Sequence, residues 1–365
     1  MHTRIGFLGG GQLASLLAQS ASERGFQVTA FCDSIDDPIT NLCQKVFVGK
    51  RDDRESLRHF FEQVDMVLLE SEFFQADLLR SLSSETSTPV YPNIDDYERL
   101  YTKVGQKKLM DEIGVPYAKT TPLDQMSDFS SPHILKLSHG GYDGYGNNEV
   151  SNLSEALKVV GDLDQKLFFL EEKLNLTAEY ACLLIKGKNQ SYIYDPCETI
   201  QKDHKCLFVN DGPQIDESIK SQIRSYVERI DEKLEGPGIY AFEFFYDEKG
   251  RILFNEAAPR VHNSYHFSME SYTYSQFDMF INAVTSEELY LPERIYTHAT
   301  MLNIVGVIKG DYQLKFPFNN ELSPYKIHMY GKKESRPGRK LGHMTFFDNK
   351  DTFESAKWVE REHKL

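Results

Sequence analysis

The sequence predicts an α/β protein with a parallel sheet at its N-terminal end. Four short apolar segments have the length and composition of strands: residues 4–8, 27–31, 45–48 and 66–69. An amphipathic segment at about 13–24 predicts a helix between the first two. Strands that alternate with helices at this spacing form parallel sheets, because each helix carries the chain back to the end where the next strand begins.

A glycine-rich turn joins the first predicted strand to this helix. Gly9, Gly10 and Gly11 are followed by Gln12, Leu13 and Ala14, which satisfies the pattern G-x-G-x-x-A, and Asp33 follows about twenty residues later. In this position the pattern is the fingerprint of dinucleotide-binding enzymes, so an NAD-dependent dehydrogenase is one hypothesis. A glycine turn before a helix also binds other phosphates and anions, or has a purely structural role.

A second unit with strands and helices is predicted after a helix at 102–113 and a polar stretch at 120–132, which is a plausible domain boundary. Its first strand, 134–137, carries Lys136 and leads into the glycine-rich loop Gly140–Gly146. A lysine at a strand end beside backbone N–H groups of a flexible loop suits a nucleoside triphosphate. The Walker A pattern is absent, and a solvated lysine beside a surface loop is the alternative.

The next predicted strand, 166–170, ends in two carboxylates, Glu171 and Glu172, and Glu179 follows soon after. Carboxylates at a strand end can accept hydrogen bonds from an adenine amino group or from ribose hydroxyls. A solvated acidic turn is the alternative. Segments 180–185 and 191–194 predict an antiparallel pair, and 218–234 predicts a helix.

Two carboxylates lie in apolar strands further along the chain. Glu243 belongs to the segment 240–245, and Glu256 follows the segment 252–254 together with Asn255. A carboxylate in so apolar a strand is costly to bury unless a cation meets it. Two such strands side by side offer oxygen ligands to a hard cation such as Mg²⁺. Pairing with a lysine is the alternative, although no lysine is near in sequence.

A dense group of polar side chains follows Glu256. Arg260, His262, Asn263, Ser264 and His266 suit the positioning of an anionic substrate, with the guanidinium as a bidentate partner. Either histidine can instead be a buried structural residue.

From residue 299 onward the sequence predicts short strands and turns. This C-terminal part contains a basic stretch at 330–343. It includes Lys332, Arg339 and Lys340 in a chain whose formal net charge is −14. Local positive charge in an acidic protein attracts an anionic substrate such as a sugar phosphate, and a solvated turn is the alternative.

The composition limits the class of protein. A length of 365 residues suggests two or three domains. The net charge of −14 argues against a nucleic-acid partner. The five cysteines have an odd count and no metal-type spacing, so we expect reduced thiols. No apolar run has the length of a membrane span, and the N-terminus lacks the apolar core of a signal peptide, so we expect a cytoplasmic protein without a membrane partner.

Together these motifs resemble the ATP-grasp superfamily, and most closely its carboxyaminoimidazole ribonucleotide synthetases, also called the ATPase subunit of phosphoribosylaminoimidazole carboxylase. The resemblance covers nearly the whole chain. Its most specific part is Gly-Gly-Tyr-Asp-Gly at 140–144 followed by Asn-Glu-x-Ala-Pro-Arg-x-His-Asn-Ser at 255–264. Further matching segments are 9–13, His266, 275–277 and 338–343.

The resemblance implies three domains: a Rossmann-like N-terminal domain at 1–98, an ATP-grasp domain at 99–298 and a small C-terminal lobe at 299–365. It also implies an activity, in which ATP and Mg²⁺ activate bicarbonate as carboxyphosphate and the carboxyl group passes to the amine of aminoimidazole ribonucleotide. A homodimer is implied as well. In this family the glycine turn faces the ribonucleotide, which weakens the dehydrogenase hypothesis.

By position, the resemblance assigns site residues to four groups. ATP binding is implied for Lys103, Lys136, Glu171, Glu172 and Glu179, and Mg²⁺ binding for Glu243 and Glu256. Catalytic roles are implied for Tyr142, Asp143, Arg260, His262 and Lys340. Contacts with the ribonucleotide are implied for Gly11, Gln12, Asn263, Ser264, His266, Lys332 and Arg339.

The chain departs from the family pattern mainly on the side that receives bicarbonate and the ribonucleotide. Tyr145 stands where a basic residue is usual, Tyr265 stands where glycine is usual, and a histidine expected near Gln201 is missing. Ala14-Ser15 and Phe73 replace other usual residues. These changes leave two alternatives open: an ATP-grasp carboxylate–amine ligase with a different acceptor, and a non-catalytic ATP-binding protein.

Overall fold

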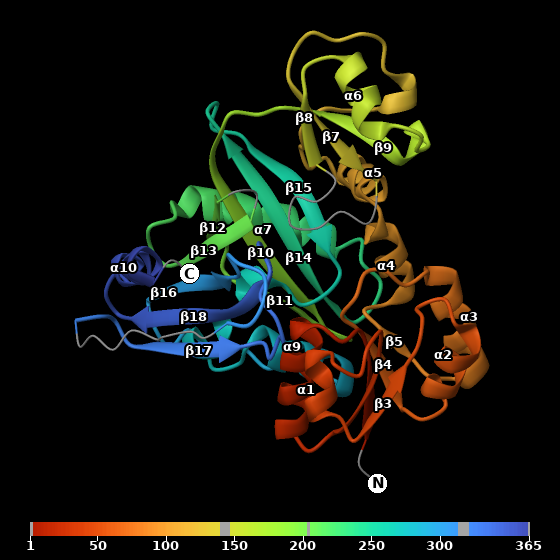
Figure 1. The fold of residues 1–365 in the computed structure, drawn as a ribbon. Helices are drawn as coiled ribbons and strands as arrows, with labels where there is room; N and C mark the ends of the chain where they lie inside the picture. Colours follow the sequence, from red (N-terminus) through yellow and green to blue (C-terminus); the bar gives the residue numbers. More distant parts are fainter. Residues whose placement is uncertain (1–2, 139–146, 203–204, 313–320, 364–365) are drawn as a thin grey trace.

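The computed structural model describes residues 3–138, 147–202, 205–312 and 321–363. The strands of these residues form three sheets, of five, four and nine strands (Figure 1). The glycine-rich loop predicted at Gly140–Gly146 lies outside the described residues, and so do Tyr142, Asp143 and Tyr145.

The N-terminal sheet is parallel, as predicted, with the strand order β3-β2-β1-β4-β5. Its strands are β1 (Arg4–Leu8), β2 (Gln27–Cys32), β3 (Lys45–Val48), β4 (Met66–Leu69) and β5 (Val90–Tyr91). Ile5 and Phe7 of β1 pack with the apolar side of α1 (Gln12–Glu23). Leu8 points to the opposite face, which α2 (Arg54–Phe61) and α3 (Ala76–Thr86) cover. Side chains alternate between the two faces of a strand, and this alternation lets β1 contribute to two cores.

The glycine turn after β1 lies against the end of β4. Gly9 has a φ of 128°, which is a conformation that glycine adopts without strain. A β-carbon at Gly9 or Gly11 would collide with the carboxylate of Glu70, and one at Gly10 would collide with Asp37. The glycines therefore allow two acidic side chains to approach the backbone of the turn. A short 3₁₀ helix, η1 (Pro38–Leu42), follows Asp37.

The four-stranded sheet is antiparallel, with the order β6-β9-β7-β8. Its strands are β6 (Thr120–Pro122), β7 (His133–Leu137), β8 (Asn147–Val150) and β9 (Phe168–Glu172), and its helical elements are η2 (Leu123–Gln125), α6 (Leu153–Val160) and η3 (Gln165–Leu167). The strand predicted at 166–170 therefore begins later, because Asp164 caps η3 through the backbone N–H of Lys166 at 3.0 Å. Glu171 and Glu172 lie inside the strand as a result. Part of the polar stretch at 120–132 also pairs as a strand rather than serving only as a boundary.

The nine-stranded sheet has the order β15-β14-β10-β12-β13-β16-β18-β17, and β11 pairs with β10 beside this path. Its strands are β10 (Leu176–Lys186), β11 (Ser191–Ile193), β12 (Cys197–Lys202), β13 (Lys205–Asp211), β14 (Gly238–Asp247), β15 (Ile252–Ala258), β16 (His298–Val305), β17 (Tyr325–Met329) and β18 (Lys340–Asp348). The predicted antiparallel pair is present, with Leu184 opposite Ile193. The C-terminal strands are longer than expected, and they extend the same sheet across residue 298.

Helices connect and cover the sheets. The N-terminal sheet is followed by α4 (Ile94–Tyr101) and α5 (Lys103–Ile113), which lead to the four-stranded sheet. Helix α5 ends at Gly114, which has a left-handed backbone conformation. On one face of the large sheet lies α7 (Glu217–Asp231). On the other lies α9 (Gln276–Thr285), which also contacts α1. The remaining helical elements are η4 (Asn263–Tyr265), α8 (Ser268–Ser271) and α10 (Phe353–His363).

The contact between α1 and α9 includes polar bonds that fix the N-terminal sheet on the large one. Ser20 donates to Asp278 at 2.8 Å, and Arg24 pairs with the same carboxylate at 2.7 Å. Within the described ranges, none of the helices has the length and hydrophobicity needed to span a lipid bilayer.

Candidate active site

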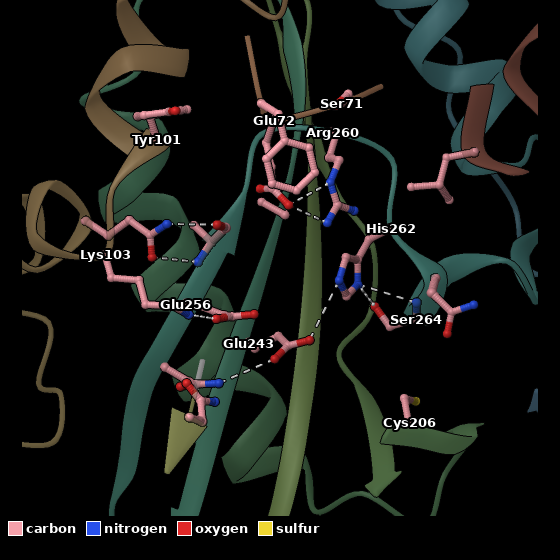
Figure 2. Close-up of a pocket in the computed structure, with 18 of the residues that line it drawn as sticks. Ser71, Glu72, Tyr101, Lys103, Cys206, Glu243, Glu256, Arg260, His262 and Ser264 are labelled. Carbon is pink, nitrogen blue, oxygen red and sulfur yellow. Dashed lines mark hydrogen bonds and ion pairs between the residues drawn. The ribbon is translucent and has the colours of Figure 1, made fainter. Parts of the chain in front are cut away.

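All three sheets contribute to one cavity of about 930 Å³ (Figure 2). The glycine turn after β1, the end of β4 and the start of α5 line it on one side, and strands β7, β9, β10, β14 and β15 line it on the other. Most of the predicted site residues line this cavity: Gly11, Gln12, Lys103, Lys136, Glu171, Glu172, Glu179, Glu243, Glu256, Arg260, His262, Asn263, Ser264 and Lys340.

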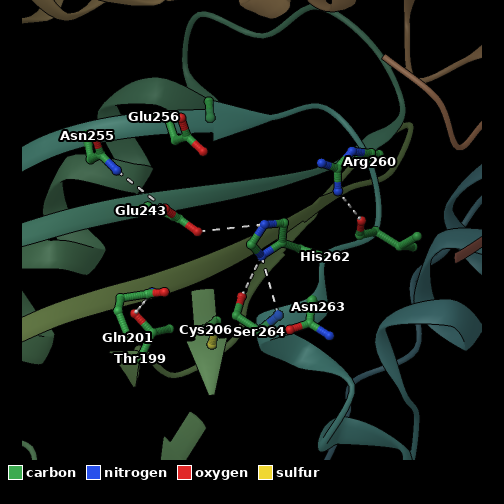
Figure 3. Close-up of polar contacts among 12 residues, drawn as sticks. Thr199, Gln201, Cys206, Glu243, Asn255, Glu256, Arg260, His262, Asn263 and Ser264 are labelled. Carbon is green, nitrogen blue, oxygen red and sulfur yellow. Dashed lines mark hydrogen bonds and ion pairs between the residues drawn. The ribbon is translucent and has the colours of Figure 1, made fainter. Parts of the chain in front are cut away.

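Glu243 and Glu256 lie directly opposite each other on β14 and β15. The register then skips Asn255, which is the extra residue of a β-bulge. A bulge re-aims side chains, and it lets the amide of Asn255 donate to Glu243 at 3.4 Å while Glu256 also faces the cavity (Figure 3). Three oxygen-bearing side chains thus meet at one point of the cavity wall.

The two carboxylates differ in charge state. Burial, together with the nearby Glu256 and Glu179, raises the pKa of Glu243 to about 8. Burial would also raise the pKa of Glu256, but Lys103 and Lys136 outweigh this effect and hold it at about 2. Lys103 donates directly to Glu256. Pairing with a lysine, the alternative that the sequence left open, is therefore present at Glu256, because α5 brings Lys103 to β15 from 153 positions away.

This arrangement fits a magnesium ion. Two carboxylates and an amide oxygen are the ligand types that a hard cation prefers. Their side chains are partly open to the cavity, at 23% exposure for Glu243 and 36% for Glu256. Burial and like-charge repulsion together keep Glu243 protonated, and a divalent cation bound by both carboxylates would offset both effects.

A buried lysine–glutamate–lysine triad lies beside these carboxylates, and two of its members, Lys136 and Glu171, line the cavity. Glu171 lies 2.5 Å from Lys136 Nζ and 2.6 Å from Lys107 Nζ, and its side chain is 3% exposed. Burial would raise the pKa of Glu171, but Lys136 and Lys107 outweigh it and lower the pKa. The carboxylate of Glu171 thus holds Lys136, which also donates to Asn255 at 3.2 Å.

Lys107 was not among the predicted site residues. A signal for it was present, because Lys103 and Lys107 are four positions apart on one predicted helix and so share a face. Glu179, on β10, lines the cavity as predicted, and burial raises its pKa to about 7.

Arg260 contacts the N-terminal side of the cavity, and His262 faces Glu243 on β14. Arg260 pairs with Glu72, just after β4, at 2.8 Å, which is a link that the sequence did not indicate. His262 Nδ1 lies 2.7 Å from the hydroxyl of Ser264, and its Nε2 lies 3.7 Å from Glu243 (Figure 3). Asn263 exchanges hydrogen bonds of 2.9 and 2.7 Å with Asn303.

Four residues that the sequence placed near the substrate do not line the cavity. His266 is 0% exposed, with Nδ1 2.9 Å from the amide nitrogen of Gln276. Tyr265 is also 0% exposed, and its hydroxyl donates to the carbonyl of Asp195 at 2.8 Å. Arg339 bonds to the carbonyl of Glu334 in a surface turn. Lys332 lies near Arg339 and also near Glu70 and Asp37, which line the cavity, although Lys332 itself does not. Tyr265, the departure from the family's glycine, is therefore a core residue and not part of the cavity wall.

Three family descriptions match consecutive parts of the chain. The ribonucleotide synthetase preATP-grasp domain matches residues 1–98, the ATP-grasp domain matches 115–277, and the phosphoribosylaminoimidazole carboxylase C-terminal domain matches 299–355. The N5-carboxyaminoimidazole ribonucleotide synthase of Staphylococcus haemolyticus is 30% identical over 353 residues, which are 94% of this chain and 92% of the relative. The chain belongs to this synthase family.

Other members of the N5-carboxyaminoimidazole ribonucleotide synthase family are similar over the same extent. The Synechocystis enzyme is 32% identical over 374 residues, which are 98% of this chain and 95% of the relative. The solved structure of the Staphylococcus aureus synthetase, complexed with ADP, superimposes with a TM-score of 0.87 at 25% identity and covers 100% of this chain and 98% of that one. The predicted resemblance and fold class are thus confirmed, and the protein is an ATP-grasp ligase.

Membership of the synthase family also decides between the two hypotheses for the glycine turn. Residues 1–98 match a ribonucleotide synthetase domain, which argues against a dehydrogenase.

Proposed function

We propose that this protein catalyses the ATP- and Mg²⁺-dependent carboxylation of aminoimidazole ribonucleotide by bicarbonate, a step of purine biosynthesis. The observation that carries the proposal is the cavity itself. It places a carboxylate pair and two buried lysines beside a group of anion-binding residues, in a chain that aligns along nearly its full length with the synthases.

The first step is phosphoryl transfer to bicarbonate. A bicarbonate oxygen forms a bond to the γ-phosphorus of ATP, the bond to the leaving oxygen of ADP breaks, and carboxyphosphate results. Lys103 and Lys136 bind the phosphate oxygens and neutralise their charge. When bound, Mg²⁺ on Glu243 and Glu256 supplies further neutralisation of the phosphates.

The present partners of the lysines suit this role. Lys103 pairs with Glu256 in this structure. When ATP and the metal ion bind, Lys103 would pair with a phosphate and Glu256 with the cation, so two ion pairs would replace one. Neither the ammonium nor the carboxylate is left unpaired in the exchange, which keeps its electrostatic cost low.

The second step transfers the carboxyl group. The exocyclic amine of the ribonucleotide forms a bond to the carbon of carboxyphosphate, phosphate leaves with its oxygen, and the nitrogen loses one proton. We assign Arg260 to the carboxyphosphate anion, because its guanidinium is held by Glu72 in the cavity wall. His262, between Ser264 and Glu243, is positioned to accept the amine proton.

The remaining assignments belong to the same proposal. Gly11, Gln12, Asn263 and Ser264 contact the ribonucleotide, and Glu172 and Glu179 contact the adenosine, as their places in the cavity wall support. Lys340, which also lines the cavity, keeps its proposed catalytic role. Tyr142 and Asp143 keep their proposed catalytic roles on the basis of sequence alone. We also propose a cytoplasmic homodimer with domains at 1–98, 99–298 and 299–365, the ends of which are supported by the matched ranges 1–98 and 299–355.

A second candidate is an ATP-grasp ligase with a different acceptor. It is favoured by Gln201, which lines the cavity and bonds to Thr199 at 3.5 Å near where the family usually has a histidine. Tyr265, in contrast, gives this candidate no support, because it is buried in the core.

ADP release measured with and without aminoimidazole ribonucleotide and bicarbonate separates the two candidates. The proposal expects ADP release to require both. ATP turnover that does not depend on this ribonucleotide would exclude the purine reaction, and turnover with another amine would favour the second candidate. A protein that binds ATP without any turnover would be the non-catalytic form.

A further inference from the structure

A cluster of histidine and carboxylate side chains lies outside the cavity, at the end of the nine-stranded sheet. His328 on β17 and His343 on β18 are directly opposite each other in the antiparallel register. Residues opposite each other share a face of the sheet, and the two rings stack with centroids 4.8 Å apart and planes at 22°. Glu270, from α8, meets them, and its carboxylate lies 2.7 Å from His328 Nε2.

Two buried polar atoms of this cluster have no hydrogen-bond partner among the described residues. His343 is 0% exposed, and its Nδ1 bonds to the hydroxyl of Tyr330 at 2.8 Å, which leaves Nε2 unpaired. One carboxylate oxygen of Glu270, whose side chain is 4% exposed, is also unpaired. Buried polar atoms are nearly always hydrogen-bonded, so two unpaired ones in a single cluster call for an explanation, and a bound ion is one.

We propose that Glu270, His328 and His343 form a binding site for a divalent transition-metal ion such as Zn²⁺. One carboxylate and two imidazoles are a ligand set that zinc accepts, with the fourth position open to water. Magnesium is a poor occupant, because it prefers oxygen ligands in octahedral geometry.

The geometry requires only small adjustments. One ligand atom from each residue lies within 4.8 Å of the others. Ligand atoms around a tetrahedral zinc are about 3.3 Å apart, so movements of about 1 Å bring them into place. The side chain of His328 is 21% exposed, which gives an ion a route from solvent.

The site is separate from the cavity, because none of its three residues lines that cavity. An ion there joins α8, which follows the segment that carries Arg260 and His262, to the outermost strands β17 and β18. Lys340, at the start of β18, does line the cavity. The metal therefore has a structural role, in which it holds the C-terminal strands against the central part of the molecule.

The test is titration of the full-length, chelator-treated protein with ZnCl₂ by calorimetry, in excess Mg²⁺ so that Glu243 and Glu256 are occupied. We expect one Zn²⁺ per chain, and binding at least about 10-fold weaker in His328→Gln and in Glu270→Gln, since even the loss of an outer partner of a metal ligand costs that much. Co²⁺ as a second probe should give the visible absorption of a four-coordinate ion in the wild type only.

His59→Gln is the matched control, because His59 also lies beside a glutamate, with Nδ1 3.7 Å from Glu62, but on the surface. It should bind Zn²⁺ as the wild type does. The proposal is overturned if the wild type binds no Zn²⁺, or if His328→Gln binds it as tightly as the wild type does. If Glu270→Gln does not fold, the His328→Gln variant alone tests the proposal. This variant should fold, because the side chain of His328 is partly exposed and glutamine keeps a hydrogen-bond donor for Glu270.

Discussion

Lys103, at the start of α5, donates to Glu256 on β15 and so joins a proposed phosphate-binding group to a proposed metal ligand. Both residues of the pair line the cavity. The pair also explains how two carboxylates are tolerated side by side, because the cation lowers the pKa of one of them while the other is held protonated.

Removal of the carboxylate at Glu256 should abolish most activity. We expect Glu256→Gln to lower kcat for ADP release by on the order of 10²–10³-fold, because a group that neutralises charge during phosphoryl transfer is lost. Circular dichroism should show the fold retained. Glu217→Gln, on the surface helix α7, is the control and should keep full activity. Full activity of Glu256→Gln at saturating Mg²⁺ would mean that Glu256 is not a ligand.

The buried triad of Lys107, Lys136 and Glu171 should stabilise the fold as well as position Lys136 in the cavity. Glu171→Gln leaves Lys136 and Lys107 facing a neutral group, and breaking a buried pair in this way costs about 3–5 kcal/mol. Urea denaturation at pH 7 should show this loss in the free energy of unfolding. Glu172→Gln, the exposed neighbour, should change it by less than about 0.5 kcal/mol. Equal stabilities for the two variants would show that the triad is not a stabilising unit.

The raised pKa of Glu179 predicts a pH dependence with a definite sign. The folded value of about 7 lies above the ordinary 4.5, so the folded state holds a proton that the unfolded state loses in this interval. The stability contribution is full below 4.5 and is lost as the pH rises through 7. Glu179→Gln stays neutral, so its stability relative to the wild type should increase from pH 5 to pH 8. A difference that is constant with pH would contradict the assignment.

Arg260 should matter for the acceptor half of the reaction. Arg260→Lys keeps the charge but loses the bidentate geometry, so we expect kcat/KM for bicarbonate to fall by about 10²-fold. The KM for ATP should change by less than about 3-fold, because Lys103 and Lys136 hold the phosphates in this mechanism. Parallel losses for both substrates would argue that Arg260 has a general structural role.

Tyr265 and Gln201 both differ from the family pattern, but Tyr265 is buried in the core and Gln201 lines the cavity. Tyr265→Phe removes a buried hydroxyl that donates to the carbonyl of Asp195, so stability should fall by about 1–3 kcal/mol with little change in KM for either substrate. Gln201→His should alter KM for the acceptor and leave stability nearly unchanged. A changed acceptor KM in Tyr265→Phe would show that the ring does influence the cavity.

The N-terminal sheet could be predicted from sequence because local patterns determine it. Strands 45–48 and 66–69 end where their apolar segments end. The strand at 166–170 was displaced because a single cap at Asp164 turned its first residues into a 3₁₀ helix. Such a choice depends on one hydrogen bond, which hydrophobic periodicity does not reveal.

The site residues were predicted mainly where chemistry and strand position coincide, as at Glu243 and Glu256. Their partners were missed where the contact is long-range, as with Lys103 and Glu256 or with Arg260 and Glu72. His266 was assigned to the site by resemblance, and Tyr265 was counted among the departures on the substrate side, but both side chains are buried in the core at η4 and its C-cap. Adjacent residues in a helical turn point in different directions, and sequence proximity alone therefore misleads.

The continuity of the large sheet across residue 298 has a consequence for truncated forms of the protein. β16 pairs with β13, so a chain that stops at 298 would leave the backbone of β13 as a bare edge. Unpaired strand edges recruit other chains, and such a fragment should aggregate rather than fold into a soluble ATP-binding unit. The C-terminal lobe thus protects the ATP-grasp sheet from self-association, in addition to what Lys340 contributes to the cavity.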